Sequence, residues 1–153
     1  MTTIETTTET FTELLRHPKE VAAAAELGAV RITRRDAADL ILVRARDLER
    51  RAEGILLTLQ LMQALVKNGS VAAALEDEFS WVQMLSEGER SEFAREIEPL
   101  LRSAPELGEF DGLLKCFWSW RSTAQAYAAG IPRDGSDLEW LPPSDRPVVP
   151  RPA

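Results

Sequence analysis

The stretch from Arg31 to Val43 constrains the fold most, because it carries the clearest β-strand pattern in the chain. Val30 and Ile32 alternate with polar residues, a polar turn follows, and the turn leads into the apolar run Leu40–Val43. This order predicts an antiparallel hairpin. An isolated hairpin is marginally stable in water, so its apolar face requires cover from helices, another strand or a second copy of the chain.

A long amphipathic helix is predicted directly after the hairpin, from about residue 45 to residue 67. Its apolar residues recur at alternating spacings of four and three: Leu48, Ala52, Ile55, Leu59, Met62 and Val66. Such a seven-residue repeat packs either inside one chain or across a dimer. We favour the dimer, because the hairpin also lacks cover. The expected dimer interface comprises Leu40, Leu42, Leu48, Ile55 and Leu59.

Helix signals elsewhere divide the chain of 153 residues into three parts. Capping-box spacing at Thr10–Glu13 and Ser86–Glu89 predicts two helix starts. Pro18 is expected to begin a further helix, which Gly28 would end with a positive φ. The predicted parts are an N-terminal dimerising domain (1–68), a helical region (69–130) and a tail (131–153).

The predicted fold class is α+β. A small N-terminal domain with the order helix, β-hairpin, helix is expected to dimerise, and an all-helical region follows it. The tail holds six of the nine prolines and should be extended. Within the tail, the segment 134–141 combines acidic residues with the large apolar side chains of two leucines and a tryptophan.

The charge is unevenly distributed. The formal net charge is -7, which argues against a protein that coats nucleic acid indiscriminately. Residues 31–51 nevertheless hold seven arginines against four carboxylates, a balance of +3, whereas residues 54–153 have a balance of -6. This asymmetry indicates two different partners, and an ordinary solvated surface is the alternative.

The sequence does not indicate an enzyme, a metal site or a cofactor. His17 is the only histidine and Cys116 the only cysteine. A nucleophilic pair of these two is conceivable, but Cys116 lies in an apolar, Trp-rich stretch and is better explained as a small buried residue. The chain shows no membrane-spanning run and no secretory signal, and its single cysteine fits a reducing cytoplasm.

Three aromatic residues in four positions stand out in the second half, at Phe117, Trp118 and Trp120. Four positions exceed one helical turn, so these rings cannot share one narrow face. Trp118 or Trp120 is therefore expected to point away from the core contact of its own helix. Core packing is one interpretation of these residues, and an exposed anchor for another protein is the other.

Three pieces follow one another in the first 55 or so residues: the helix Phe11–Val21, the strand Arg31–Arg35, and the run Leu40–Val43 followed by Ala45–Glu49. In this order and spacing they resemble the Phd/YefM family of antitoxins. The ordered set carries the resemblance rather than any single piece. Asp36 stands where the family often has Gly, which is tolerable because Asp accepts turn geometry.

The resemblance implies a cytoplasmic homodimer with two partners. Its N-terminal half would bind operator DNA in its own promoter, and its C-terminal half would block a cognate toxin protein. Arg16 matches the family's helix arginine and Arg34 the arginine of Thr-Arg, and these two are assigned to DNA. Lys19, Arg31 and Arg35 are expected phosphate contacts. A surface ion pair with Asp36 or Asp39 is the alternative role for Arg34.

The second half plus the tail is the expected toxin-facing region. The family's C-terminal half is often a short segment that orders on its toxin, whereas residues 70–130 here look able to fold alone. The candidate toxin contacts are Trp118, Trp120, Leu138, Trp140 and Leu141. The alternative function is a protein-binding adaptor on the same dimer scaffold that does not bind an operator.

Overall fold

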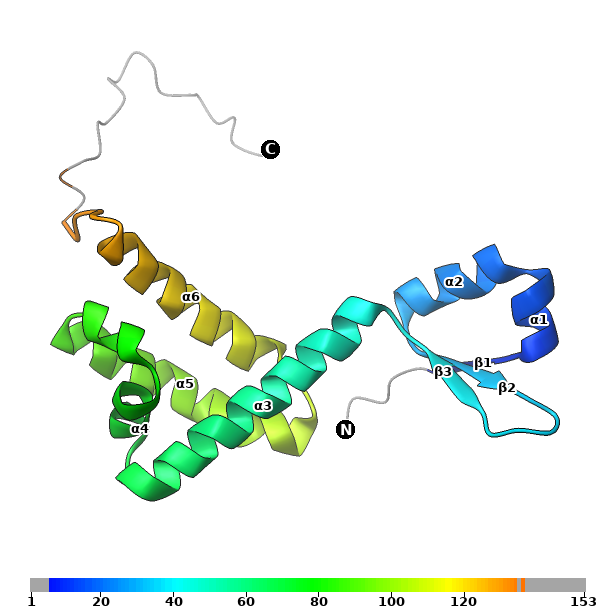
Figure 1. The fold of residues 1–153 in the computed structure, drawn as a ribbon, viewed down its shortest axis with the longest axis horizontal. Helices are drawn as coiled ribbons and strands as arrows, with labels where there is room; N and C mark the ends of the chain where they lie inside the picture. Colours follow the sequence, from blue (N-terminus) through cyan, green and yellow to red (C-terminus); the bar gives the residue numbers. More distant parts are fainter. Residues whose placement is uncertain (1–5, 135, 137–153) are drawn as a thin grey trace, which may run out of the picture.

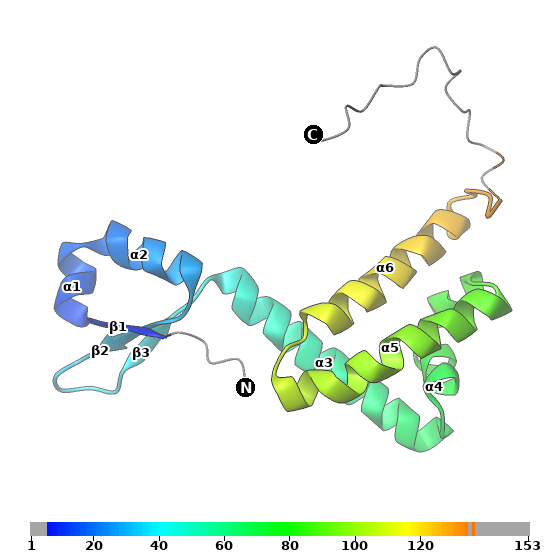
Figure 2. The same ribbon diagram turned by 180° about the vertical axis from the view of Figure 1, so that it is seen from behind.

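The computed structural model describes residues 6–134 and 136, which form two units joined by one long helix (Figure 1). Figure 2 shows the same arrangement from behind, with the strands gathered at one end of the molecule and α4, α5 and α6 at the other. The elements are β1 (Thr7–Thr10), α1 (Phe11–Arg16), α2 (Pro18–Leu27), β2 (Val30–Thr33), β3 (Leu40–Leu42), α3 (Ala45–Asn68), α4 (Val71–Glu78), the 3₁₀ helix η1 (Ser80–Met84), α5 (Glu87–Leu107) and α6 (Asp111–Ala128).

The N-terminal unit is a three-stranded sheet in the order β1-β2-β3 with α1 and α2 beside it. β1 pairs with β2 in parallel, and β2 pairs with β3 in antiparallel register with Val30 opposite Leu42. The two helices form the crossover that parallel pairing requires. Val21 and Ala25 of α2 pack on Val30 and Ile32 of β2, which are almost fully buried.

The predicted fold class is wrong in its layout. The hairpin itself is present, but the N-terminal unit is not helix, hairpin, helix: a strand precedes the helices, and the sheet has three strands rather than two. The described chain as a whole is mostly helical. The sequence Thr-Thr-Glu-Thr of β1 shows no apolar alternation, so it left open whether residues 1–9 form a loose lead-in or a short edge strand. Its pairing uses the backbone groups on the open edge of β2, and these do not depend on side-chain pattern.

Most of the predicted helix boundaries are confirmed by specific contacts. Pro18 is the first residue of α2. The Oγ1 atom of Thr10 accepts a hydrogen bond from the backbone N–H of Glu13 at 3.1 Å. The capping box at Ser86 is complete, because Ser86 N–H donates to the Glu89 carboxylate and Glu89 N–H donates to Ser86 Oγ.

Gly28 is the exception among the predicted helix ends. Its φ is -179°, which is extended backbone rather than the positive φ that was expected. The chain enters β2 directly from α2, and an extended residue at this position continues into the strand without a left-handed turn.

The C-terminal unit is a helical module around one apolar core. Leu61 of α3, Leu75 of α4, Phe93 and Ile97 of α5 and Leu113 of α6 have almost no exposed surface. Edge-to-face and tilted aromatic contacts tie η1 to this core, with ring centroids 4.9 Å apart for Phe79 and Phe117, 5.5 Å for Trp81 and Phe117, and 5.7 Å for Trp81 and Phe93. This core explains why residues 71–128 form a folded module.

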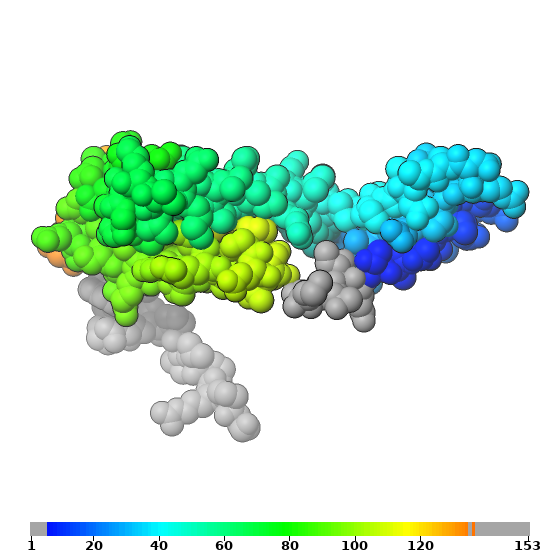
Figure 3. Space-filling view, turned by 90° about the horizontal axis from the view of Figure 1, so that it is seen from below, coloured from blue at the N-terminus to red at the C-terminus, as the bar shows by residue number. Residues whose placement is uncertain are grey.

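Helix α3 connects the two units, and the molecule is accordingly elongated (Figure 3). Its second half contributes Leu57 and Leu61 to the helical core, so α3 belongs to that module as much as to the sheet. Gly69 ends α3 in the left-handed conformation with φ 79°. No helix among the described residues is both long enough and apolar enough to cross a membrane.

Candidate nucleic-acid and protein interfaces

The predicted DNA-binding residues lie in the N-terminal unit, but not on a single element. Arg16 is the last residue of α1 and Lys19 the second residue of α2. Arg34 and Arg35 follow β2 and line a hollow together with Thr10, Phe11 and Thr12, at the point where β1 passes into α1. The fold thus brings the end of β2 to the start of α1, although more than twenty residues separate them in the sequence.

Arg31 lies apart from the other predicted cations. It pairs across the sheet with Ile41, on the face opposite to buried Val30 and Ile32. Its Nε atom is 3.5 Å from the Asp39 carboxylate, so its charge is partly compensated. Arg31 is therefore a weaker candidate for a phosphate contact than the other four cations.

Arg34 does not form the carboxylate pair that was its alternative role. Its guanidinium donates two hydrogen bonds to the backbone carbonyl of Ala38, at 2.7 Å from Nε and 2.5 Å from Nη2. The side chain therefore closes the turn between β2 and β3. A carbonyl does not neutralise the guanidinium, so Arg34 keeps its full charge in a fixed position.

Arg16, Lys19 and Arg35 are exposed and form no ion pair within residues 6–134 and 136. Six arginines within residues 6–134 do have carboxylate partners: Arg31, Arg44, Arg50, Arg90, Arg95 and Arg102. Uncompensated cations on one unit attract polyanions more strongly than paired ones. Arg16, Lys19 and Arg35 are therefore the cations of the N-terminal unit whose charge is free to attract an anion, although residues 6–43 as a whole hold five Arg and Lys against six Asp and Glu.

The predicted dimer interface on α3 is exposed in the single chain. The side chains of Leu48, Ile55 and Leu59 are 61%, 40% and 55% exposed. The residues of α3 that the helical module buries are different ones: Gly54, Leu57, Thr58, Leu61 and Ala64. At 100° per residue, the two sets lie on opposite faces of the helix. Helix α3 is therefore apolar on both sides, and only one side is covered.

The two leucines predicted on β3 differ in their burial. Leu42 is half-buried and packs on the core of the N-terminal unit, whereas Leu40 is exposed. Ile41, which the prediction omitted, is 55% exposed on the open face of the sheet. β3 is also an edge strand with unpaired backbone groups along one side. Leu40 and Ile41 are therefore two further exposed apolar side chains, and they lie on opposite faces of the edge strand.

The two candidate tryptophans have different surroundings. The Nε1–H of Trp120 donates to the Glu96 carboxylate at 2.8 Å, and its ring lies 5.7 Å from that of Phe93, so Trp120 packs on the core. Trp118 is 40% exposed, with the guanidinium carbon of Arg121 4.7 Å from its ring centroid. Of the two, Trp118 has the exposure that a partner contact requires.

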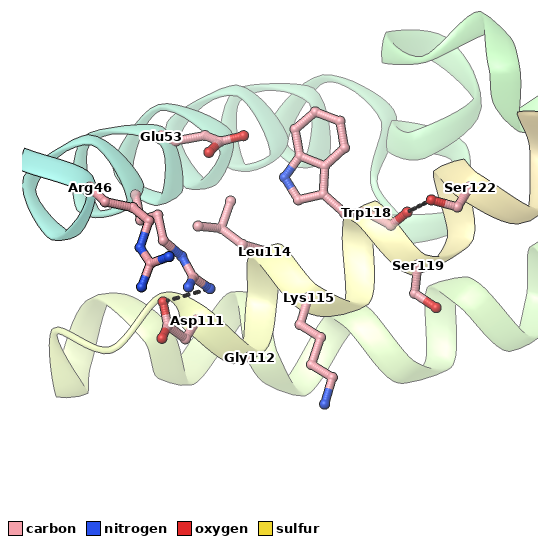
Figure 4. A pocket seen from close by; sticks show the side chains of 10 residues that line it. Arg46, Glu53, Asp111, Gly112, Leu114, Lys115, Trp118, Ser119 and Ser122 are labelled. Atoms are coloured by element: carbon pink, nitrogen blue, oxygen red, sulfur yellow. Dashed lines mark hydrogen bonds and ion pairs between the residues drawn. The ribbon is translucent and has the colours of Figure 1, made fainter.

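Trp118 lies in a groove of 780 Å³ between α3 and α6, which we call the α3–α6 groove (Figure 4). Leu114 and Trp118 point from α6 toward α3, and Arg46 extends from α3 beside the Arg50–Asp111 ion pair of 3.1 Å. The sequence analysis did not identify this groove. Its two walls lie about sixty residues apart in the chain, and no local pattern signals their contact.

The two residues considered for nucleophilic chemistry do not meet. His17 lies at the junction of α1 and α2 between Glu13 and Glu20, at 3.9 Å from each carboxylate, whereas Cys116 lies on α6 in the other unit. Burial, with a smaller contribution from Glu96, raises the pKa of the Cys116 thiol to about 11. A thiol with this pKa is a poor nucleophile at neutral pH.

Two observations complete the description of candidate sites. No group of three or more His, Cys, Asp or Glu side chains within the described part of the chain is placed to hold a metal ion. The candidate toxin contacts Leu138, Trp140 and Leu141 lie outside the described residues.

Comparison with known proteins provides no relative from which a function could be transferred. No protein-family model, no curated protein sequence and no solved structure matches the chain. The function is therefore argued from the residues and their geometry.

Proposed function

We propose that this chain is a DNA-binding antitoxin that acts in the cytoplasm as a homodimer. In this proposal the N-terminal unit binds operator DNA upstream of its own gene, and the helical half binds and neutralises a partner toxin. The proposal follows from the resemblance of the first 55 residues to the Phd/YefM antitoxins. The observation that carries it is the set of uncompensated cations on the N-terminal unit, Arg16, Lys19 and Arg35, together with the fixed Arg34.

The charge pattern supports DNA in particular as the anion. Arginine matches phosphate and guanine through two parallel hydrogen bonds. The net charge of -7 would repel a polyanion from most of the surface, so contact would be confined to the surroundings of these cations. A confined basic surface fits recognition of one site better than coating of nucleic acid.

The uncovered surface of α3 and β3 supports the dimer. Leu48, Ile55, Leu59, Leu40 and Ile41 are large, apolar and exposed on adjoining elements. Leu48, Ile55 and Leu59 share one face of α3, and an exposed apolar stripe of this kind usually marks an interaction surface. A two-fold dimer would present two sets of the N-terminal cations to a palindromic operator.

The test is a gel shift with the DNA upstream of the chain's own gene, at two salt concentrations and with a scrambled competitor. The double variant Arg16→Ala, Arg35→Ala should lose the specific shift. It should also reduce the slope of log affinity against log salt by about 2 for each protomer, because each lost phosphate contact changes that slope by about 0.9. Lys19→Ala, which leaves both arginines in place, should cause a smaller loss.

The matched control is Arg95→Ala, Arg102→Ala. It removes the same charge from exposed positions of α5, where both arginines pair with carboxylates of their own helix. Equal losses of affinity in the two double variants would refute the assignment of Arg16 and Arg35, because bulk charge would then explain the effect. Full operator affinity in the first variant would refute it as well.

A protein-binding adaptor that does not bind an operator is the second candidate. The ion pair of Arg31 favours it, because one of the five predicted DNA contacts already has an anionic partner. A wild-type dimer that gives no specific shift, but co-purifies with a protein encoded beside its gene, would establish this candidate over the first.

A further inference from the structure

The hollow where β1 passes into α1 combines positive charge with an exposed aromatic ring, and we call it the β1–α1 hollow. Its lining consists of three threonines, two arginines and one phenylalanine: Thr10, Phe11, Thr12, Thr33, Arg34 and Arg35. No Asp or Glu side chain belongs to this lining, whereas the α3–α6 groove contains both Glu53 and Asp111. An anion in the β1–α1 hollow therefore meets cations and hydroxyl groups without an opposing charge in the wall.

Three polar groups of the hollow can serve a phosphate. Arg35 has no carboxylate partner among residues 6–134 and 136, so its guanidinium is available. Thr10 Oγ1 accepts the N–H of Glu13, and a hydroxyl that accepts one hydrogen bond still has a proton to donate. Arg34 is held by the carbonyl of Ala38 and contributes its charge from a fixed position. Phosphate contacts of this kind orient a protein on DNA but do not read its sequence.

Phe11 is the residue of the hollow that these contacts leave unexplained. It begins α1, and its side chain is 40% exposed. It belongs to neither of the two buried apolar clusters that the described residues form, and the α1 side chain that packs on the N-terminal cluster is Leu14. Phe11 therefore presents an apolar ring to solvent beside two arginines.

The position of α1 brings this ring to an accessible end of the molecule. Figures 1 and 2 both show α1 and the β2–β3 turn at the end farthest from the helical module. Arg16 lies one turn after Thr12 on the same face of α1, so a further free cation adjoins the hollow. A duplex held by these cations lies against α1, away from the acidic helical half.

We propose that Phe11 contacts the C5 methyl group of a thymine in the major groove of operator DNA and so selects for that base. Each base pair presents donors and acceptors in this groove, and thymine adds a methyl group. A phenyl ring has no conventional hydrogen-bonding group, so it distinguishes bases through that methyl group. This inference rests on the proposed function, because it requires the N-terminal unit to bind duplex DNA.

The first test needs no substitution in the protein. Gel shifts compare the DNA upstream of the chain's own gene with the same duplex made with deoxyuridine in place of thymidine, which removes the methyl groups and keeps the base pairing. The wild type should bind the uracil duplex about five- to tenfold more weakly, at the lower end of what one base contact contributes. Its affinity for a scrambled duplex should be the same with either base.

Phe11→Ala assigns this loss to the ring. The variant should bind the thymine duplex about five- to tenfold more weakly than the wild type does, and it should bind the uracil duplex no more weakly than the thymine duplex. The two changes remove the same contact, so their effects should not add. The slope of log affinity against log salt should stay unchanged, because Phe11 holds no phosphate.

Leu27→Ala is the matched control. It truncates another exposed apolar side chain of the N-terminal unit, at the end of α2 and outside the β1–α1 hollow. This variant should behave like the wild type on both duplexes. Far-UV circular dichroism and sedimentation equilibrium check that both variants keep the fold and the oligomeric state of the wild type.

Four results would overturn the inference about Phe11. Unchanged affinity of Phe11→Ala for the thymine duplex would show that the ring does not contact DNA. An equal loss on both duplexes would show that the ring acts without the methyl group. A flatter salt dependence in Phe11→Ala would show that the ring only positions the arginines of the hollow, and conversion to a monomer would place it between protomers. All four leave specific binding by the wild type, and hence the proposed function, in place; a wild type that shifts no operator specifically would overturn both.

Discussion

The contact between Gly54 and Phe110 gives the sharpest prediction about stability. Gly54 lies in the middle of α3, where Phe110, directly before α6, packs against it. A Cβ atom built on Gly54 would be 2.3 Å from Phe110 Cβ and 2.7 Å from Phe110 Cγ. Real Cβ atoms do not approach other carbons this closely, so Gly54→Ala forces α3 and the start of α6 apart by more than 1 Å.

Two opposing effects set how far Gly54→Ala changes the free energy of unfolding. Replacing glycine by alanine inside a helix stabilises the helix by about 1 kcal/mol. Overpacking costs about 1–3 kcal/mol, and the upper end applies here because Phe110 is buried and its Cβ is bonded to the backbone. The net loss in the free energy of unfolding is about 2 kcal/mol. For a chain of this size, Tm should fall by about 4–8 °C.

Gly88→Ala is the matched control, measured by thermal and urea unfolding monitored at 222 nm. Gly88 is also helical, in the first turn of α5, but an added Cβ there has no neighbour within 4 Å. The free energy of unfolding of this variant should rise by up to about 0.5 kcal/mol. The added Cβ meets no neighbour, so the remaining effect is the lower conformational entropy of the unfolded chain. An unchanged or raised Tm in Gly54→Ala would refute the close packing of α3 on Phe110, and with it the geometry of the α3–α6 groove.

Three further predictions concern the dimer, a pH-dependent contact and the cysteine. Leu48→Glu with Ile55→Glu should convert the dimer into a folded monomer, and sedimentation equilibrium that still reports a dimer would contradict the role of the α3 stripe. The hydroxyl of Tyr127 donates to the Glu89 carboxylate and lowers the pKa of Glu89 from its ordinary value of 4.5. The stabilisation lost in Tyr127→Phe should therefore be largest above pH 4.5 and should vanish as the pH falls through the lowered pKa, and a pH-independent difference in urea midpoints would contradict this. With its pKa raised from 9.0 to about 11, Cys116 holds about a hundredfold less thiolate at neutral pH, so iodoacetamide should label it far more slowly in the native chain than in urea.

Much of the secondary structure was predictable because its signals are local. A proline at the first position of α2 and a serine with a glutamate three residues later at α5 act on backbone groups within one turn. Alternation of apolar residues likewise identified the β2–β3 hairpin. The same local reasoning failed at Gly28, because the strand that follows it, rather than the glycine itself, sets its conformation.

The candidate sites were predictable only in part. The sequence identified Arg16, Lys19 and Arg35 as cations, but only the folded chain shows that they have no carboxylate partner among residues 6–134 and 136, whereas Arg31 pairs with Asp39. Likewise the sequence placed Trp118 and Trp120 together, yet a hydrogen bond to Glu96 holds one in the module while the other stays 40% exposed. Whether a charge is free or paired depends on side chains from distant parts of the sequence.

The sequence by itself determined where several helices begin, that a hairpin follows Gly28, and that α3 carries an apolar seven-residue repeat, but it wrongly predicted a loop from Pro105, which lies inside α5. Tertiary structure decided that polar β1 joins the sheet, that the helical module covers the opposite face of α3, and that α3 and α6 enclose a groove. The reason is physical. Caps, turns and periodicity act within a few residues, whereas strand pairing and helix packing depend on the surface that remains after distant elements have met.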